Sequence, residues 1–283
     1  MKRFMLLLTI LILLTSCITE YRPEEHTFIT NPTSGAELFV NIYKPSDWNG
    51  EALPTIILIP GGSSYSSYYE EFDRAQTLSE EGFTIITFDP DGRGKSGGFD
   101  DQNGFTHQDG LAAIIEFVAT LPEVDPNQMG IFSQSYGVTL ASGVLARYPQ
   151  LPLSFLIDYE GPANRDDTGG CDEAGTGHLQ DLVTCDDEMF WAEHEAETFI
   201  SQIHVPYQRL QKIRDHAQPD YEHTIIMNNA AVEGLSPWVR LNYLQLNIIY
   251  TEENLPPMLS NMFGEKLLEE LPNLVNEMLA LPY

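Results

Sequence analysis

A serine near the middle of the chain lies in a pattern typical of nucleophilic catalysis. Ser135 stands two residues after Ser133 and two residues before Gly137. Small residues at those two positions allow a strand to turn abruptly into a helix, as in the G-x-S-x-G motif, where Ser133 here replaces the first glycine. Such a turn lifts the hydroxyl clear of the sheet and directs the positive end of the helix toward it. The pattern therefore predicts a nucleophile elbow with Ser135 as the attacking group.

Two backbone positions could stabilise the negative charge that develops when a hydroxyl attacks a carbonyl. Gly61 follows an earlier apolar run in the sequence Pro60-Gly61-Gly62, and a glycine there allows the backbone N–H to approach an oxyanion. The N–H of Tyr136, directly after the serine, is the expected second donor. We therefore expect an oxyanion hole formed by Gly61 and Tyr136.

The segment 88–98, Phe-Asp-Pro-Asp-Gly-Arg-Gly-Lys-Ser-Gly-Gly, resembles the D-x-R-G-x-G-x-S turn common in α/β-hydrolases. We interpret its Asp91 and Arg93 mainly as loop structure. With the elbow and the oxyanion glycines, the chain resembles the α/β-hydrolase superfamily. Within it, the chain most resembles the exported peptidase and esterase branches, such as prolyl-oligopeptidase-like and dipeptidyl-peptidase-like hydrolases. The residues that carry the resemblance to the dipeptidyl-peptidase-like branch are Phe190-Trp191 and the segment 203–207. This likeness names no substrate.

Strand and helix patterns alternate along the chain. Short apolar runs rich in β-branched residues predict strands over 37–43, 54–59, 83–88, 129–133, 153–157, 205–211 and 245–250. Helical patterns occur over 72–81, 106–121, 138–148 and 219–232. This alternation predicts an α/β fold with a mostly parallel central sheet and helices on both faces.

An insertion at about 160–200 interrupts the alternation and carries twelve acidic residues against one basic residue. We expect an acidic cap over the carboxyl-terminal edge of the sheet, solvated and without a metal. A calcium site is the alternative, because hard cations bind clustered carboxylates, but no EF-hand spacing is present.

Two cysteines, Cys171 and Cys185, lie within this insertion. In an oxidising compartment they are expected to form a disulfide, which would stabilise the fold by about 3 kcal/mol in the chain-entropy model. Two free thiols or a soft-metal pair are the alternatives, although no histidine or cysteine cluster with zinc spacing accompanies them.

The catalytic acid is expected after the strand that follows the insertion, because the order in this fold is serine, acid, histidine. Asp215 lies four residues past Gln211 and fits that place, with Asp158 as the second choice. The usual histidine slot, 251–254, holds no histidine, and none lies after His223.

Three accounts of the base remain open. His223, eight residues after Asp215, is the preferred base; His216 is its alternative, although neighbouring side chains do not readily meet in triad geometry. A histidine could instead arrive from elsewhere, since triads are defined by geometry; the candidates are His107, His178 and His194. The third account is a binding relative of the hydrolases that has no base.

The first residues predict the compartment. Lys2 and Arg3 precede an apolar run over 5–14, which is too short for a membrane span of about 20 residues. The run ends in Leu-Thr-Ser-Cys17, which resembles the bacterial lipobox. That resemblance implies a signal peptide at 1–16 and a lipid on Cys17. We expect a polar tether at 17–26 and the hydrolase domain at 27–283. We therefore expect a lipid-anchored protein of the bacterial cell envelope, in the periplasm or at the cell surface.

The chain is strongly acidic, with a formal net charge of −28. Loss of Lys2 and Arg3 with the signal leaves 12 basic against 42 acidic residues, a net charge of about −30. This charge excludes a nucleic-acid partner and argues against anionic substrates. The sequence thus predicts a serine hydrolase that cleaves an ester or peptide bond in a small molecule or peptide without a cofactor, and that touches the membrane only through its lipid. The alternative is an inactive relative that binds a peptide or glycan.

Overall fold

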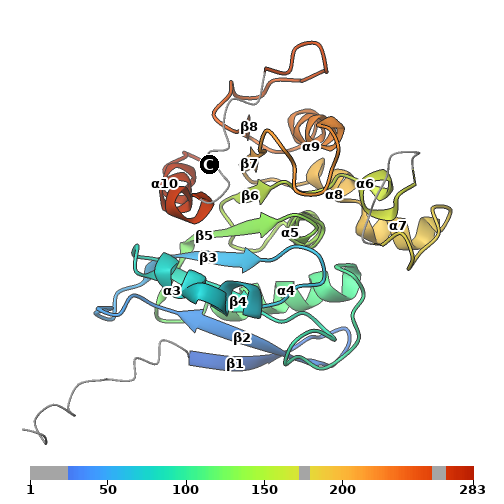
Figure 1. Ribbon diagram of the computed structural model, residues 1–283. Helices are drawn as coiled ribbons and strands as arrows, with labels where there is room; N and C mark the ends of the chain where they lie inside the picture. The colour runs from blue at the N-terminus through green and yellow to red at the C-terminus, as the bar shows by residue number, and fades with distance from the viewer. Residues whose placement is uncertain (1–24, 172–178, 257–265) are drawn as a thin grey trace, which may run out of the picture.

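The computed structural model describes residues 25–171, 179–256 and 266–283. Its centre is an eight-stranded sheet in the order β1-β2-β4-β3-β5-β6-β7-β8 (Figure 1). The strands are β1 (Glu25–Thr30), β2 (Glu37–Tyr43), β3 (Leu53–Ile59), β4 (Thr84–Phe88), β5 (Val124–Gln134), β6 (Leu156–Tyr159), β7 (Tyr207–Leu210) and β8 (Val239–Leu241). The pairs β1–β2 and β2–β4 are antiparallel and the other pairs are parallel. The predicted fold class, an α/β-hydrolase fold with a mostly parallel sheet, is confirmed.

Helices cover both faces of the sheet because successive strand side chains point to opposite sides. In β3, Ile57 and Ile59 belong to one apolar core, whereas Ile56 and Leu58 belong to the other. The helices α4 (Phe105–Val118), α5 (Gly137–Arg147), α8 (Ala196–Ile200) and α9 (Glu222–Glu233) contribute to the first core. The helices α3 (Arg74–Ser79) and α10 (Leu267–Leu279) contribute to the second, on the opposite face (Figure 1). The sequence analysis did not predict α10.

The helix predicted over 72–81 is divided in the structure. The chain forms α2 (Ser67–Glu70), one 3-10 turn (Glu71–Asp73) and then α3. Phe72 and Asp73 have φ values of 60° and 53°, in the left-handed region that non-glycine residues seldom adopt. These two residues therefore kink the chain between α2 and α3.

The last strand was predicted wrongly at 245–250, and the structure places it earlier, at Val239–Leu241. Asn242 and Asn247 adopt left-handed φ values of 48° and 53°, which end the extended backbone. The Asn242 side chain accepts from the Gln211 N–H at 2.8 Å and donates to its carbonyl at 3.0 Å. An amide side chain thus continues the pairing where the strand stops, a contact that hydrophobic patterning does not reveal.

The insertion forms two helices beside the sheet, α6 (Arg165–Gly169) and α7 (Glu188–His194), before α8 returns to the first core. The predicted disulfide between Cys171 and Cys185 is confirmed. Trp191 of α7 is fully buried against Tyr136 and Leu179 in a small separate core. The cap therefore packs directly on the residue that follows Ser135.

The predicted signal peptide, Cys17 and most of the tether lie outside the described residues and stay predictions. Glu25 and His26, placed in the tether by the sequence analysis, belong to β1 instead. Among the residues that the structure describes, no helix combines the length and apolar character needed to cross a membrane.

The disulfide should stabilise the fold measurably. Replacing Cys171 and Cys185 by serine should lower the free energy of unfolding by about 3 kcal/mol, because the unfolded chain gains the freedom of an open loop. Urea unfolding followed by circular dichroism measures this difference. The Cys171→Ser variant alone should lose as much stability as the double variant, and a reductant should destabilise only the native chain. Equal midpoints for the native chain with and without reductant would contradict the prediction.

Candidate active site

Ser135 lies at the junction between β5 and α5, and its backbone is strained. Its φ is 51°, in the left-handed region, a conformation that costs a non-glycine residue about 1–3 kcal/mol unless the surroundings enforce it. The Ser135 N–H donates to the Tyr159 carbonyl at 2.8 Å, and the Ser135 carbonyl accepts from the Val138 N–H at 3.0 Å. The neighbouring strand and the new helix together hold the elbow that the sequence predicts.

Three small residues make room for this turn. A Cβ on Gly61 would lie 2.7 Å from the Ser135 Cβ, and a Cβ on Gly137 would lie 2.6 Å from the Pro60 carbonyl oxygen. Ser133, which stands where a glycine is usual, is fully buried. The loop after β3 therefore closes tightly on the elbow only because these side chains are absent or small.

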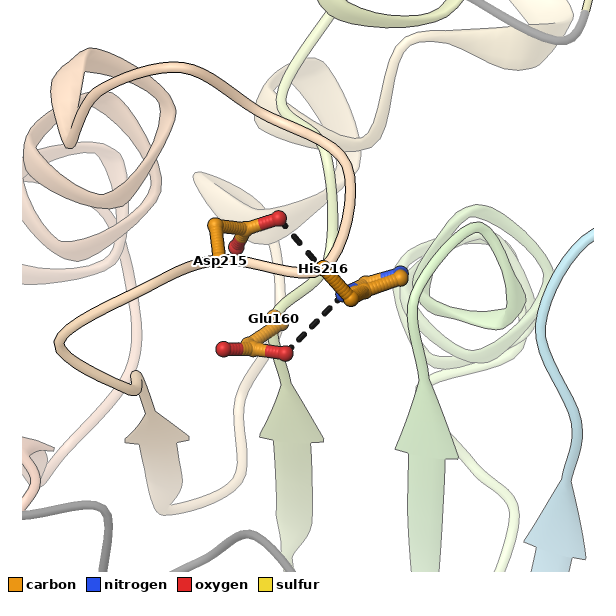
Figure 2. A group of neighbouring side chains, drawn as sticks. All are labelled: Glu160, Asp215 and His216. Carbon is orange, nitrogen blue, oxygen red and sulfur yellow. Dashed lines mark hydrogen bonds and ion pairs between the residues drawn. The ribbon is translucent and has the colours of Figure 1, made fainter.

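His216 contacts the serine directly. Its Nε2 lies 2.9 Å from the Ser135 Oγ, and its Nδ1 lies 2.9 Å from the Glu160 Oε2. Figure 2 shows the imidazole with the Glu160 and Asp215 carboxylates on its Nδ1 side. The order carboxylate, imidazole, hydroxyl is the arrangement in which a histidine can remove a serine proton.

Glu160 directly follows β6, the strand beside the elbow strand, and its side chain is fully buried. Its backbone is also left-handed, with a φ of 53°, and its N–H donates to the Leu210 carbonyl at 3.0 Å. The Lys212 N–H donates to Oε1 at 3.2 Å, and the Lys212 ammonium lies 3.1 Å from Oε2. The neighbouring strand β7 and its loop therefore fix the position of the carboxylate.

The sequence analysis missed Glu160 because it ended this strand at residue 157. In the structure β6 continues to Tyr159, so the first side chain beyond the strand is Glu160 instead of Asp158. The available signal was an acidic residue followed by Gly161-Pro162, which ends a strand.

The surroundings of His216 favour its protonated form. The hydrogen bond to Glu160 raises the pKa of His216 above its ordinary value of 6.5; partial burial opposes this, and the Asp215 charge adds to it. A carboxylate that stabilises imidazolium in this way strengthens the histidine as a base.

Asp215, the predicted acid, lies on the same loop as His216 and holds that loop in place. Its Oδ1 accepts from the backbone N–H groups of Ala217 at 2.7 Å and Gln218 at 2.9 Å, and its Oδ2 accepts from the Gln211 side chain at 2.8 Å. Burial alone would raise the pKa of Asp215, but the hydrogen bonds hold it well below its usual range. Its distance to the His216 Nδ1 is 3.5 Å, longer than that of Glu160.

His223, the preferred base in the sequence analysis, lies on α9 and is fully buried. Its Nε2 is 3.3 Å from the Asp215 Oδ2 and 3.3 Å from the Thr224 Oγ1. The structure therefore brings His216, the alternative base, to Ser135 and leaves His223 behind Asp215. Asp215 and His216 are neighbours in the sequence and do not have to pair with each other. The acid closest to His216 is Glu160, which follows a different strand.

The remaining histidine candidates in the described residues make structural contacts. His107 lies in the first turn of α4, with its Nε2 2.9 Å from the Asp91 carbonyl and its Nδ1 accepting from the Asn103 N–H at 3.2 Å. His194 stacks on Phe190, with ring centroids 3.7 Å apart. His178 lies outside the described residues.

The other acid candidate and the Asp91–Arg93 turn also have structural partners. Asp158 is fully buried, pairs with Arg209 and accepts from the Tyr207 hydroxyl at 2.7 Å. Asp91 accepts from Asn31 at 2.8 Å. Arg93 forms a two-pronged pair with Asp100, with both contacts at 2.9 Å. These contacts agree with the interpretation of Asp91 and Arg93 as loop structure.

Both predicted oxyanion positions lie beside Ser135. Gly61 packs on the serine, and Tyr136 is the first residue of the turn into α5. The Tyr136 carbonyl accepts from the Asn103 side chain at 3.0 Å, and its hydroxyl donates to the Gln102 carbonyl at 2.8 Å. The loop before α4 thus holds Tyr136 and, with it, the N–H directly after the serine.

One group in the described residues has the composition of a metal site. Ligand atoms of Glu160, Asp215 and His216 lie within 4.8 Å of one another (Figure 2). However, the Lys212 ammonium already lies 3.1 Å from Glu160, and it would repel a cation bound there. The geometry fits a hydrogen-bonded acid–histidine pair better than a metal centre.

Two pockets flank the imidazole. The first, of about 240 Å³, is lined by Ser135, Tyr136 and Gly62 together with cap residues that include Asp167 and Thr168. The second, of about 310 Å³, lies on the side of α3 and α10. Glu160 and His216 line both pockets, so a substrate could extend to either side of the histidine.

Comparison with known families gives a match over most of the chain. The sequence model of the family described as X-Pro dipeptidyl-peptidase (S15 family) matches residues 34–220. An uncharacterised protein of Pseudomonas aeruginosa is 30% identical over 102 residues, which are 34% of this chain and 26% of that protein. The chain thus spans about a quarter of the length of this relative.

Solved structures with the same fold include peptidases and an esterase. Dipeptidyl peptidase 4 of Porphyromonas gingivalis superposes with a TM-score of 0.66 and 19% identity, over 91% of this chain and 36% of that one. An esterase of Pyrococcus furiosus superposes with a TM-score of 0.64 and 18% identity, over 93% and 98% of the two chains. At these identities the likeness shows the fold alone.

The buried Asp158 should contribute to stability. The Asp158→Asn change leaves the buried Arg209 without a compensating charge, and removing one partner of such a pair costs about 3–5 kcal/mol. Chemical unfolding should show this loss, whereas Asp166→Asn, a change on the cap surface, should alter stability by less than about 0.5 kcal/mol. An Asp158→Asn protein as stable as the native chain would contradict the structural role assigned to this acid.

Proposed function

The chain belongs to the X-Pro dipeptidyl-peptidase (S15) family, and on that premise we propose that it is a serine hydrolase that cleaves an ester or peptide bond at Ser135. The family and the fold are those of peptidase- and esterase-type hydrolases. The proposal assigns Ser135 as the nucleophile, His216 as the base and Glu160 as the acid that orients the base. Asp215 holds the loop that carries His216.

One observation supports this assignment above the others, the unbroken chain of contacts from carboxylate to hydroxyl. Both links measure 2.9 Å, from Glu160 Oε2 to His216 Nδ1 and from His216 Nε2 to Ser135 Oγ. A base within about 2.6–3.2 Å of the nucleophile is the geometric requirement for proton transfer. Ser135 and Glu160 directly follow β5 and β6, and His216 lies on the loop after β7; these three strands lie side by side in the sheet.

The proposed reaction proceeds in two halves. Ser135 Oγ attacks the substrate carbonyl carbon while His216 Nε2 takes the hydroxyl proton, and the N–H groups of Gly61 and Tyr136 face the oxyanion. The carbonyl then reforms, the bond to the leaving group breaks, and His216 gives its proton to that group. Water then attacks the acyl-serine while His216 Nε2 accepts one of its protons. The bond between the acyl carbon and Ser135 Oγ breaks, His216 returns that proton to Oγ, and the acid product and free serine result.

The rival function, a binding relative without a base, rested on the empty histidine slot near the carboxyl terminus. His216 lies at hydrogen-bond distance from Ser135, so the condition that would favour the rival is not met. No specific observation in the described residues favours a purely binding role.

A fluorophosphonate should label Ser135 in the folded native protein, because this probe reacts with activated serine nucleophiles. Ser135→Ala should abolish labelling. His216→Gln should slow it by about 10²–10⁴-fold, since the base no longer accepts the serine proton. The rate of labelling, measured by intact-protein mass spectrometry, gives these values.

His223→Gln is the matched control for this experiment. His223 is the other histidine that contacts Asp215, but it lies away from Ser135, so this change should slow labelling far less than His216→Gln. The proposed function fails if Ser135→Ala labels like the native protein, and the assignment of the base fails if His223→Gln has the larger effect.

The rate of hydrolysis or labelling should rise with pH through a pKa above 6.5. Only neutral His216 can accept a proton, and Glu160 raises its pKa, so the inactive imidazolium form persists to a higher pH than in a free histidine. Glu160→Gln removes the negatively charged acceptor of the His216 hydrogen bond. The rising limb of the pH–rate profile should then move to lower pH, and the plateau rate at high pH should fall by roughly a hundredfold or more. A pH–rate profile of each variant measures both effects.

The Asp215→Asn variant distinguishes the effect of Asp215 on His216 from the effect of Glu160. The Asp215 carboxylate lies 3.5 Å from the His216 Nδ1 instead of 2.9 Å, so the limb should move in the same direction but by less than with Glu160→Gln. A limb that moves to higher pH in Glu160→Gln would refute the proposed role of Glu160.

A further inference from the structure

The larger of the two pockets beside His216 has walls of unusual charge for this protein. Its volume is about 310 Å³, and the residues that matter for its chemistry are Tyr68, Arg74, Tyr159, Lys212, Leu267 and Leu268. Two of these are cations, although the whole chain carries only 14 lysines and arginines and a net charge of −28. Glu160 is the one acid in the lining, and its carboxylate is already shared by His216 and Lys212.

Arg74 is the first residue of α3, directly after the kink, and it lines this pocket. Phe72 and Asp73, both with left-handed backbone, direct the first residue of the helix. The Arg74 guanidinium donates to the Tyr68 carbonyl at 2.8 Å and lies over the Tyr68 ring, 4.8 Å from its centroid. Among the described residues, no carboxylate lies within ion-pair distance of Arg74. A guanidinium has five N–H donors in a planar fork that matches a carboxylate.

The position of the pocket indicates which part of a substrate it receives. Ser135, Gly62 and Tyr136 line the smaller pocket, so the carbonyl and its oxyanion belong on that side. The larger pocket meets His216 without Ser135. His216 passes its proton to the leaving group, which therefore departs on the imidazole side.

We propose that the larger pocket binds the leaving group of the substrate and that Arg74 selects a leaving group with a free carboxylate, such as the carboxyl-terminal residue of a short peptide. This inference rests on the proposed function and names its substrate class. Tyr68, Tyr159, Leu267 and Leu268 supply apolar walls for the side chain of that residue. The volume is at the lower end of the about 300–1,000 Å³ typical of ligand pockets, which suits a small leaving group.

The acidity of the whole chain disfavoured anionic substrates in the sequence analysis. The Arg74 guanidinium reverses that expectation for one pocket, because a charge at contact distance outweighs charges beyond the Debye length of about 8 Å at physiological salt.

Protection of Ser135 from a fluorophosphonate tests this inference without knowledge of the substrate. The two competitors are 3-phenylpropionate and 3-phenylpropionamide, which have similar shape and differ in charge. The carboxylate should halve the labelling rate of the native protein at a concentration at least about tenfold lower than the amide, a factor equivalent to about 1.4 kcal/mol. In Arg74→Gln, the ratio of the amide concentration to the carboxylate concentration that halves the labelling rate should fall toward one.

Lys95→Gln is the matched control, because it removes the same charge from an exposed loop outside the pocket; its ratio should equal that of the native protein. A ratio near one in the native protein, or an undiminished ratio in Arg74→Gln, overturns the inference. If Arg74→Gln does not fold, Arg74→Lys, which loses the planar fork, should still lower the ratio, and an unchanged ratio overturns the assignment to Arg74. Labelling without competitor separates the two proposals: an unlabelled native protein overturns the proposed function, whereas normal labelling with a ratio near one overturns only the carboxylate pocket.

Discussion

The contact between the Glu160 carboxylate and the His216 Nδ1 joins the ends of two neighbouring strands to the elbow on a third. β5 delivers Ser135, β6 delivers Glu160 and the loop after β7 delivers His216, and these three strands are adjacent and parallel. Side chains at the carboxyl ends of parallel strands meet at one edge of the sheet. The Ser135 N–H bonds to the Tyr159 carbonyl and the Glu160 N–H bonds to the Leu210 carbonyl. Backbone pairing therefore sets the spacing of Ser135 and Glu160, and the hydrogen bonds that Asp215 accepts hold the loop that brings His216 between them.

Three buried acids near this edge differ in role because each has different partners. Asp158 pairs with Arg209 below the site, and Asp215 accepts the hydrogen bonds that shape its own loop. Glu160 alone lies at hydrogen-bond distance from the imidazole, and the Lys212 ammonium beside it compensates part of its charge. A buried carboxylate is costly unless it is paired and hydrogen-bonded. The hydrogen-bond and ion-pair partners of these carboxylates thus offset the cost of burying them. The same partners determine which carboxylate can act on His216.

Much of this arrangement could be predicted from the sequence, and the failures have physical causes. The elbow at Ser135 and the sheet follow from local patterns, small residues around the turn and β-rich strands. Glu160 was missed because β6 extends two residues beyond its predicted end, and a shift of that size changes which side chain leaves the strand first. His216 was ranked below His223 because sequence neighbours rarely meet in triad geometry. That rule does not apply when the acid comes from another strand, a relation that only the assembled sheet reveals.

Family membership and the catalytic geometry answer different questions. The fold is shared with peptidases and an esterase, and one fold can support different chemistries according to its site. In this chain, different residues line the two sides of His216. The cap packs Trp191 against Tyr136 on the side of the smaller pocket, whereas Arg74, Lys212 and the first turn of α10 line the opposite side. Net charge averages over the whole surface and hides such a contrast, so the charge lining one pocket can differ in sign from the net charge of −28.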